Sequence, residues 1–218
     1  MAEDQKVRQP RQDRAPSHRI AVFIDGQNLE NTIREDFPGK RMDWTRLTAL
    51  LRKWGNLVGI YIYLVDLADS DDPEKQKKIE AYRRWLRWLR RNGFRVRTKL
   101  IKYIETLEGR KGKCNFDVEM AVDAITLAAT GRIDEIFLFS SDSDFAYLAE
   151  QLQNYAVRVT VVGSTHRTAT ELRERCDEFI PLGSLKLEVL IDWLPSRARD
   201  TSDAMHEDPL VLTPPPAD

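Results

Sequence analysis

Short apolar segments alternate with longer amphipathic segments along most of the chain. The first runs from His18 to Asp25 and contains five consecutive apolar residues, as in a strand with both faces buried. Similar strands are expected at residues 57–65, 94–101, 135–140, 157–163 and near residue 179, with helices at residues 42–54, 73–91, 116–130, 144–154 and 172–176. This order predicts an α/β domain with a mostly parallel, doubly wound sheet covered by helices on both sides.

Polar segments without hydrophobic periodicity flank this body. Residues 1–18 are expected to form a flexible arm, and residues 196–218, which end in a proline run, a disordered tail. The domain itself is then expected to span residues 19–195. Its last segment, residues 185–193, carries Leu187 and Leu190 in an amphipathic pattern. That segment can pack on the body or on a second copy of the chain, which makes a homodimer possible.

Acidic residues follow two of the predicted strands at the point where each strand ends. Asp25 ends the first strand, and Asp142 follows the strand of residues 135–140. Asp117 begins a helix whose N-terminus lies at the same edge, because that helix runs antiparallel to the strands. Ligands of doubly wound sheets bind beyond the carboxyl ends of the strands. We therefore expect Asp25, Asp117 and Asp142 to converge there.

Three further polar residues lie close to these acids in sequence. Asn28 can offer an amide to the same edge. Asp144 either faces the site or opens the next helix, where a carboxylate is favoured. Asp123 lies about 9 Å further along its helix than Asp117 and points about 120° away. It therefore ranks below Asp117 as a site residue, although a tilted helix can bring it in.

Converging carboxylates repel one another unless they are protonated, paired with bases or bridged by a cation. The 2 cysteines are far apart and the 3 histidines are scattered, so neither offers an alternative ligand set. Carboxylate oxygens suit Mg²⁺ or Mn²⁺, which can activate water against a phosphodiester. The candidate ligands are Asp25, Asp117, Asp142, Asp144 and, more weakly, Asp123. The alternative is that each aspartate only caps a helix or a turn.

Charge is unevenly distributed along the body. Residues 73–113 contain 15 Lys and Arg against 4 Asp and Glu, whereas the remainder of residues 19–195 contains 13 against 23. The helix expected at residues 73–91 interleaves arginines with aromatic residues, and an exposed tryptophan can stack on an unpaired base. Candidate substrate-binding cations are Arg84, Arg87, Arg91 and Lys113. The alternative is a core tryptophan, Trp85 or Trp88, beside solvated arginines.

Several other classes of protein are disfavoured. No apolar run approaches the roughly 20 residues of a membrane-spanning helix, and the first residues lack the apolar core of a signal peptide. A cytoplasmic location without a membrane partner is therefore expected. Glycine-rich phosphate loops are absent, and Gln27 replaces the second acid of an Asp-x-Asp phosphatase motif. No serine lies in a nucleophile-elbow sequence. Hydrolysis assisted by a cation remains the favoured chemistry.

Three sequence blocks follow one another along the chain: RIAVFIDGQNLEN, KCNFDVEMAVDAITLA and IFLFSSDSDFAYLAEQLQNYAVRVTVVG. Together they resemble the blocks of the NYN domain, a PIN-like family, and most of all its LabA-like branch. The resemblance covers about residues 19–182. It implies a PIN-like α/β/α sandwich and Mg²⁺- or Mn²⁺-dependent ribonuclease activity. Asp25, Asp117 and Asp142 match the acid of each block in turn.

Two positions depart from the usual blocks of that family. The middle block commonly reads Lys-Gly-x-Asp, whereas here Lys113 and Asp117 enclose Cys114, Asn115 and Phe116. The last block commonly reads Ser-Gly-Asp-Ser-Asp, whereas Ser141 stands at the glycine position. Ser141 is therefore expected to contact, or to crowd, an approaching substrate. Neither change removes a carboxylate.

The sequence thus favours a metal-dependent endoribonuclease that acts on single-stranded or structured RNA. Its substrate-binding residues are expected to be Asn28, Ser141, Lys113, Arg84, Arg87 and Arg91. An RNA-binding or regulatory adaptor without turnover is one alternative. A structure-selective DNA nuclease is another, because the 2′-hydroxyl is recognised by details of the groove that a sequence does not reveal.

Overall fold

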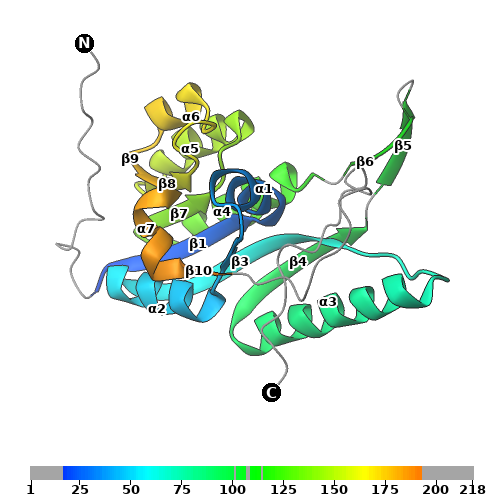
Figure 1. Ribbon diagram of the computed structural model, residues 1–218. Coiled ribbons are helices and arrows are strands. Elements are labelled where there is room, and N and C mark those ends of the chain that lie inside the picture. The colour runs from blue at the N-terminus through cyan, green and yellow to red at the C-terminus, as the bar shows by residue number, and fades with distance from the viewer. Residues whose placement is uncertain (1–16, 101, 107–108, 114, 193–218) are drawn as a thin grey trace, which may run out of the picture.

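The computed structural model of the protein describes residues 17–100, 102–106, 109–113 and 115–192, with the backbone alone for residues 102–106 and 109–113. A sheet of six strands lies between two layers of helices (Figure 1). The strands are β1 (Arg19–Asp25), β3 (Asn56–Asp66), β4 (Phe94–Leu100), β7 (Glu135–Phe139), β8 (Arg158–Gly163) and β9 (Glu178–Pro181). The predicted α/β/α sandwich is confirmed.

All neighbouring strands of this sheet are parallel, in the order β4-β3-β1-β7-β8-β9. Successive side chains of a strand point to opposite faces of the sheet. In β1, Val22 and Ile24 accordingly enter one core, and Ala21 and Phe23 enter the other. The unbroken apolar run of this strand is explained by burial on both faces.

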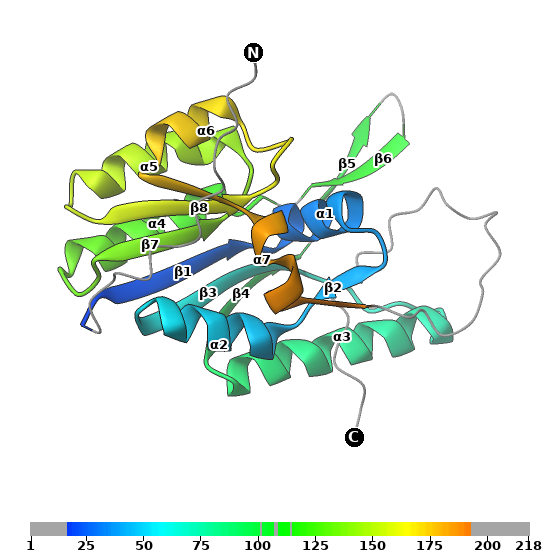
Figure 2. The ribbon, with the colours of Figure 1, turned by 60° about the vertical axis from the view of Figure 1, so that its left-hand side comes forward.

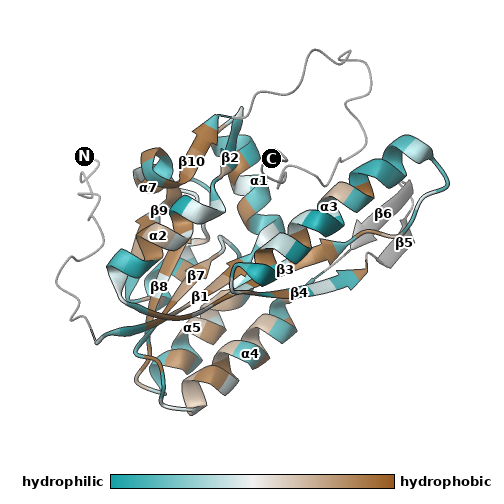
Figure 3. Ribbon diagram, turned by 90° about the horizontal axis from the view of Figure 1, so that it is seen from below, coloured by the Kyte–Doolittle hydropathy of each residue, from teal (hydrophilic) through white to brown (hydrophobic). Residues whose placement is uncertain are grey.

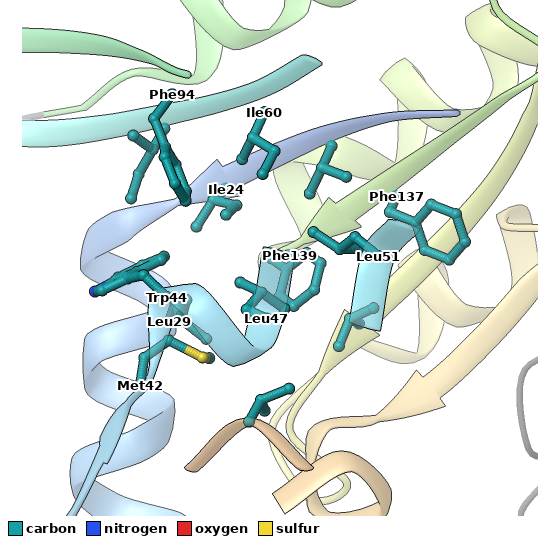
Figure 4. Packing of buried hydrophobic residues seen from close by; sticks show 14 of the residues in the cluster. Ile24, Leu29, Met42, Trp44, Leu47, Leu51, Ile60, Phe94, Phe137 and Phe139 are labelled. Carbon is teal, nitrogen blue, oxygen red and sulfur yellow. The ribbon is translucent and has the colours of Figure 1, made fainter. Parts of the chain in front are cut away.

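One face of the sheet is covered by four helices: α1 (Gly26–Asp36), α2 (Trp44–Trp54), α3 (Pro73–Arg91) and α7 (Leu182–Val189). Figure 4 shows how Leu29, Trp44 and Leu47 of the helices approach Ile24 and Phe139 of the sheet. The opposite face carries α4 (Asp117–Ala129), the 3₁₀ turn η1 (Ser143–Phe145), α5 (Ala146–Gln153) and α6 (Thr170–Arg175).

The ends of α2 and α3 agree with the sequence prediction. Asp43 caps α2 by accepting hydrogen bonds from the backbone N–H groups of Thr45 and Arg46, both at 3.0 Å. Asp72 caps α3 ahead of Pro73, and Gly93, with a φ of 87°, follows its end. A positive φ costs glycine little, which suits it to the turn from α3 into β4.

Other elements were not predicted. These are α1 and two small antiparallel sheets, β2 (Lys40–Met42) with β10 (Leu190–Asp192), and β5 (Lys102–Thr106) with β6 (Gly109–Lys113). The β5–β6 hairpin projects from the sandwich near the end of β4 (Figure 2). Within the described part of the chain, no helix is long and apolar enough to cross a membrane.

The segment of residues 185–193 differs from its prediction. Leu185 and Leu190 are buried, but Leu187 is 84% exposed. The chain changes from α7 to β10 at Leu190, so a single helical period does not hold along the segment. The expected amphipathic face containing both Leu187 and Leu190 is therefore wrong.

Candidate active site

The two central strands of the sheet end at an acidic region. These strands are β1 and β7. The sheet continues from β1 through β3 and from β7 through β8, so the strand order reverses between β1 and β7. Such a reversal leaves room for a ligand at the carboxyl edge. Asp25 is the last residue of β1, and Asp142 lies in the loop after β7. Both acids lie where the edge rule places a ligand.

One hydroxyl group joins Asp25 to the loop that carries Asp142. Ser140 donates a hydrogen bond to Oδ2 of Asp25 at 3.4 Å, and its oxygen accepts one from the Asp142 N–H at 3.2 Å. Each acid also caps a helical turn through Oδ1. Asp25 accepts from the Asn28 N–H at 3.0 Å, and Asp142 from the Asp144 N–H at 3.1 Å. Capping therefore fixes one oxygen of each carboxylate without preventing further contacts.

Asn115 orients Asp117 at the start of α4. Its side-chain amide donates to Oδ2 of Asp117, and its side-chain oxygen accepts from the Asp117 N–H at 2.7 Å. Sequence reasoning did not assign a role to Asn115 or to Ser140. In both cases the available signal was a short polar residue within two positions of a candidate acid. Both residues fix the position of an acid.

Burial and the charges of neighbouring acids raise the pKa of Asp25 and of Asp117. Burial raises the pKa of Asp25 to about 6, opposed by the bond from the Asn28 N–H, and the charges of Asp117 and Asp142 raise it further. Burial also raises the pKa of Asp117, with smaller contributions from Asp142 and Asp144. The structure therefore brings four carboxylates within electrostatic reach of one another.

Asp123 lies apart from this group. It accepts hydrogen bonds from the Tyr63 hydroxyl at 2.9 Å and from Nε of Arg97 at 3.0 Å. A second guanidinium nitrogen of Arg97 reaches its other oxygen at 3.2 Å. A carboxylate held in this way is already compensated, so we leave Asp123 out of the candidate ligands.

Asn28 and Ser141 hold loops together at the same edge. The side-chain oxygen of Asn28 accepts from the Ser141 N–H at 2.9 Å. The Ser141 hydroxyl accepts from the Ser164 N–H at 3.0 Å and lies 2.9 Å from the Thr168 hydroxyl. Because Ser141 is buried and its hydroxyl is engaged in this way, it does not crowd the approach to the acids. Both residues have a positioning role in place of the expected substrate contacts.

The arginines of α3 do not line the acidic region. α3 packs on the sheet face opposite to α4 and buries Trp85. Arg84, Arg87 and Arg91 are exposed on its outer side. α3 ends at Arg91 just before β4 begins, so its last arginines lie toward the edge of the sheet opposite to the acids, and the expected basic helix beside the acids is not found. The alternative of a core tryptophan is the correct one for Trp85. The side chain of Lys113 lies outside the described residues.

Three cationic side chains of β4 that face α4 were not singled out from the sequence. Alternate residues of this edge strand face α4: Arg95 bonds the Tyr61 hydroxyl, Arg97 pairs with Asp123, and Lys99 pairs with Glu119. Lys99 also donates to the backbone oxygen of Asn115 at 3.0 Å. The period-two spacing of these three residues after Phe94 was the available signal.

The acids suit a hard divalent cation in their chemistry, since their oxygens are the ligands that Mg²⁺ and Mn²⁺ prefer. A bridging cation would also stabilise the ionised forms of Asp25 and Asp117, whose pKa values the neighbouring charges raise. In the part of the chain that the structure describes, however, no three acidic, histidine or cysteine side chains form a ready-made ligand set. A cation is therefore an element of the proposal below.

Comparison with known proteins agrees with this geometry. The model of the NYN domain family matches residues 19–187. The low amplitude and bright protein LabA of Synechococcus elongatus is 31% identical over 173 residues, which cover 77% of this chain and 86% of LabA. An uncharacterized protein of Methanocaldococcus jannaschii is 28% identical over 82% of this chain and 61% of its own length.

A solved structure shares the fold. The crystal structure of a Vibrio parahaemolyticus protein of unknown function superimposes with a TM-score of 0.62 at 28% identity. The match covers 82% of this chain and 99% of the other. The architecture and the family resemblance thus point in the same direction.

Proposed function

The chain belongs to the NYN domain family, whose members are generally nucleases, and we propose that it is a metal-dependent endoribonuclease. One observation carries the proposal. Asp25, whose carboxylate is largely shielded from water, lies within electrostatic reach of Asp117 and Asp142 at the reversal point of the sheet. A fold that needed these residues only as caps would not need to gather their charges.

Each residue has a proposed role. Asp25, Asp117 and Asp142 hold a Mg²⁺ or Mn²⁺ ion, and the exposed Asp144 supports them from the rim. When bound, the ion supplies an activated water and stabilises the charge on the leaving oxygen of the phosphodiester. Ser140 and Asn115 keep two of the carboxylates in place through the bonds described above.

Proton binding at Asp25 sets the working pH. With a pKa of about 6, this carboxyl group is substantially protonated at mildly acidic pH in the absence of a cation. A ligand carboxylate must lose its proton before it binds a metal ion, so cation affinity is expected to fall as the pH drops through about 6.

Cleavage of labelled single-stranded RNA tests the proposal. Purified protein is incubated with Mn²⁺, Mg²⁺ or EDTA, and the same sequence as DNA is run beside it. Cutting that requires the cation and disappears in both Asp25→Asn and Asp142→Asn is expected. Ser143→Ala, an exposed change at the start of the turn η1 next to Asp142, serves as the matched control. If folded Asp142→Asn protein cuts RNA as fast as the parent, the proposal is wrong.

An RNA-binding adaptor without turnover is the second candidate. The capping bonds made by Asp25 and Asp142 favour it, because they give both acids a purely structural use. This candidate predicts tight RNA binding that neither cation nor EDTA changes, with no cleavage products from any sample.

A further inference from the structure

We propose that the outer face of α3 binds the phosphate backbone of RNA at a surface separate from the acidic site. The choice of RNA as the polyanion rests on the proposed function, whereas the surface itself rests on the charge and position of α3. The face is defined by Arg84, Arg87 and Arg91, which are exposed and belong to one side of the helix.

The charge on α3 is large and poorly balanced. Its 19 residues include eight Lys and Arg against two Glu. Some of these cations have acidic partners: Lys77 pairs with Glu74, and Arg83 pairs with Asp69. Among the residues that the structure describes, Arg84, Arg87 and Arg91 form no salt bridge, and neither does Arg90. Figure 3 shows hydrophilic residues along most of α3, in front of strands that are largely hydrophobic.

The stability of α3 does not explain the presence of these arginines. Arg84 and Arg87 are three residues apart, and Arg87 and Arg91 are four apart, so they are neighbours on the helix surface. Like charges at these spacings destabilise a helix by about 0.2–0.5 kcal/mol per pair. Favourable interaction with the C-terminal end of the helix dipole is confined to the last turn, so it accounts for Arg91 but not for Arg84. A phosphate chain would relieve this repulsion.

The position of the face separates it from the acids. α3 is about 28 Å long at 1.5 Å per residue and packs against β4 on the face of the sheet opposite to α4. On the front of that edge, Arg97 and Lys99 are already paired with acids of α4. By contrast, Arg84, Arg87 and Arg91 of α3 have no acidic partner among the described residues. An RNA that reaches both surfaces must pass around β4, so α3 is expected to contribute to affinity and not to the rate of the chemical step.

Binding of RNA to a charge-reduced protein tests the inference. The variant carries Arg84→Ala, Arg87→Ala and Arg91→Ala, which preserve helix propensity. The control removes the same charge from three exposed cations elsewhere, through Arg34→Ala, Arg132→Ala and Lys186→Ala. Both sets are placed in an Asp142→Asn background. Binding of a fluorescent 30-nucleotide RNA is measured by anisotropy in EDTA over a series of salt concentrations.

The α3 variant is expected to bind at least about ten-fold more weakly than the control. Its plot of log affinity against log salt is expected to lose about two units of slope, since each phosphate contact contributes roughly 0.7. In the active background, KM for the same RNA should rise while kcat stays unchanged. Circular dichroism confirms that both variants are folded.

Equal affinities and salt slopes for the α3 variant and the control overturn the inference, as does a parent protein that binds no RNA. The outcome is distinguishable from failure of the nuclease proposal. A parent that binds RNA through α3 but never cuts it removes the enzyme and leaves the binding surface in place.

Discussion

Asp25 ionises in a place where burial and two neighbouring acids oppose it. Its pKa is raised from 3.8 to about 6 in the folded protein. Between these values the folded chain holds a proton that the unfolded chain has lost, so the free energy of unfolding falls as the pH rises through this range. Above it, the ionised carboxylate costs up to about 3 kcal/mol, at 1.36 kcal/mol per pKa unit.

Replacement of Asp25 by Asn is therefore expected to stabilise the protein while it abolishes cleavage. In EDTA at pH 8 the gain should be about 1–3 kcal/mol, and at pH 4 it should be close to zero. Urea unfolding of the parent and the variant at both pH values measures it. A variant that is less stable than the parent at pH 8 would show that the bonds to Asn28 and Ser140 outweigh the burial of charge.

The Ser141 hydroxyl is expected to contribute to stability. A Cβ at Gly163 would lie 2.5 Å from the Thr168 hydroxyl oxygen and 2.8 Å from that of Ser141, so this glycine leaves space for the hydroxyl pair. Ser141→Ala leaves the Ser164 N–H without its acceptor and is expected to cost about 1–3 kcal/mol. Thermal unfolding of Ser141→Ala, compared with that of Ser143→Ala, measures the loss of stability. Equal melting temperatures for the two variants would contradict the prediction.

Asp123 of α4 pairs with Arg97 of the edge strand β4, whereas Asp117 of the same helix is a proposed metal ligand. Arg97 is more than half exposed, so the pair contributes at most about 1 kcal/mol. Asp123→Asn is therefore expected to lower stability slightly and to keep cleavage within a few-fold of the parent. Asp117→Asn should lower cleavage on the order of 100-fold or more. Cleavage assays of both variants with Mn²⁺ test this difference. An equal loss of cleavage rate in the two variants would make Asp123 a candidate ligand again.

Elements with a strong local signal could be predicted from the sequence. Strands buried on both faces, such as β1, appear as unbroken apolar runs, and α3 carries its own proline and glycine signals. α1 was missed because GQNLENTIRED is mostly polar, and its burial of Leu29 and Ile33 depends on the sheet beside it. β2 and β10 were missed because three-residue strands form only through pairing across the chain.

The candidate site was predictable to the extent that it follows from topology. A parallel sheet brings the ends of β1 and β7 together, which explains why Asp25 and Asp142 could be paired without coordinates. The sequence does not reveal on which side of the sheet each connection runs. That choice placed α3 on the face of the sheet opposite to α4, and the cations of β4 on the face that α4 covers.

Across the molecule, the acidic region and the arginines of α3 lie apart. The carboxylates gather at one edge of the sheet, and Arg84, Arg87 and Arg91 lie on the outer side of α3. This arrangement keeps arginines from neutralising the acids directly, which leaves the acids available for a cation. A mobile polyanion such as RNA can still be attracted to the molecule as a whole.

The limits of the folded domain give the last prediction. The described residues of both cores lie between Ile20 and Leu190, and β10 pairs with β2 through an ion pair of Asp192 and Lys40. A chain trimmed to residues 17–195 is therefore expected to melt within about 2 °C of the full chain. At roughly 4–8 °C per kcal/mol for a small domain and less for a larger one, such a shift is below 1 kcal/mol.

A chain that ends at Pro181 is the matched contrast, because it also loses α7 and β10. Four buried side chains go with them: Leu182, Leu185, Val189 and Leu190. At about 1.5–3 kcal/mol each, their burial contributes about 6–12 kcal/mol, which is comparable to the whole stability of a typical domain. The shorter chain should therefore fail to give a cooperative thermal transition. A cooperative transition near that of the full chain would mean that α7 lies outside the folding unit, and that the domain ends with β9.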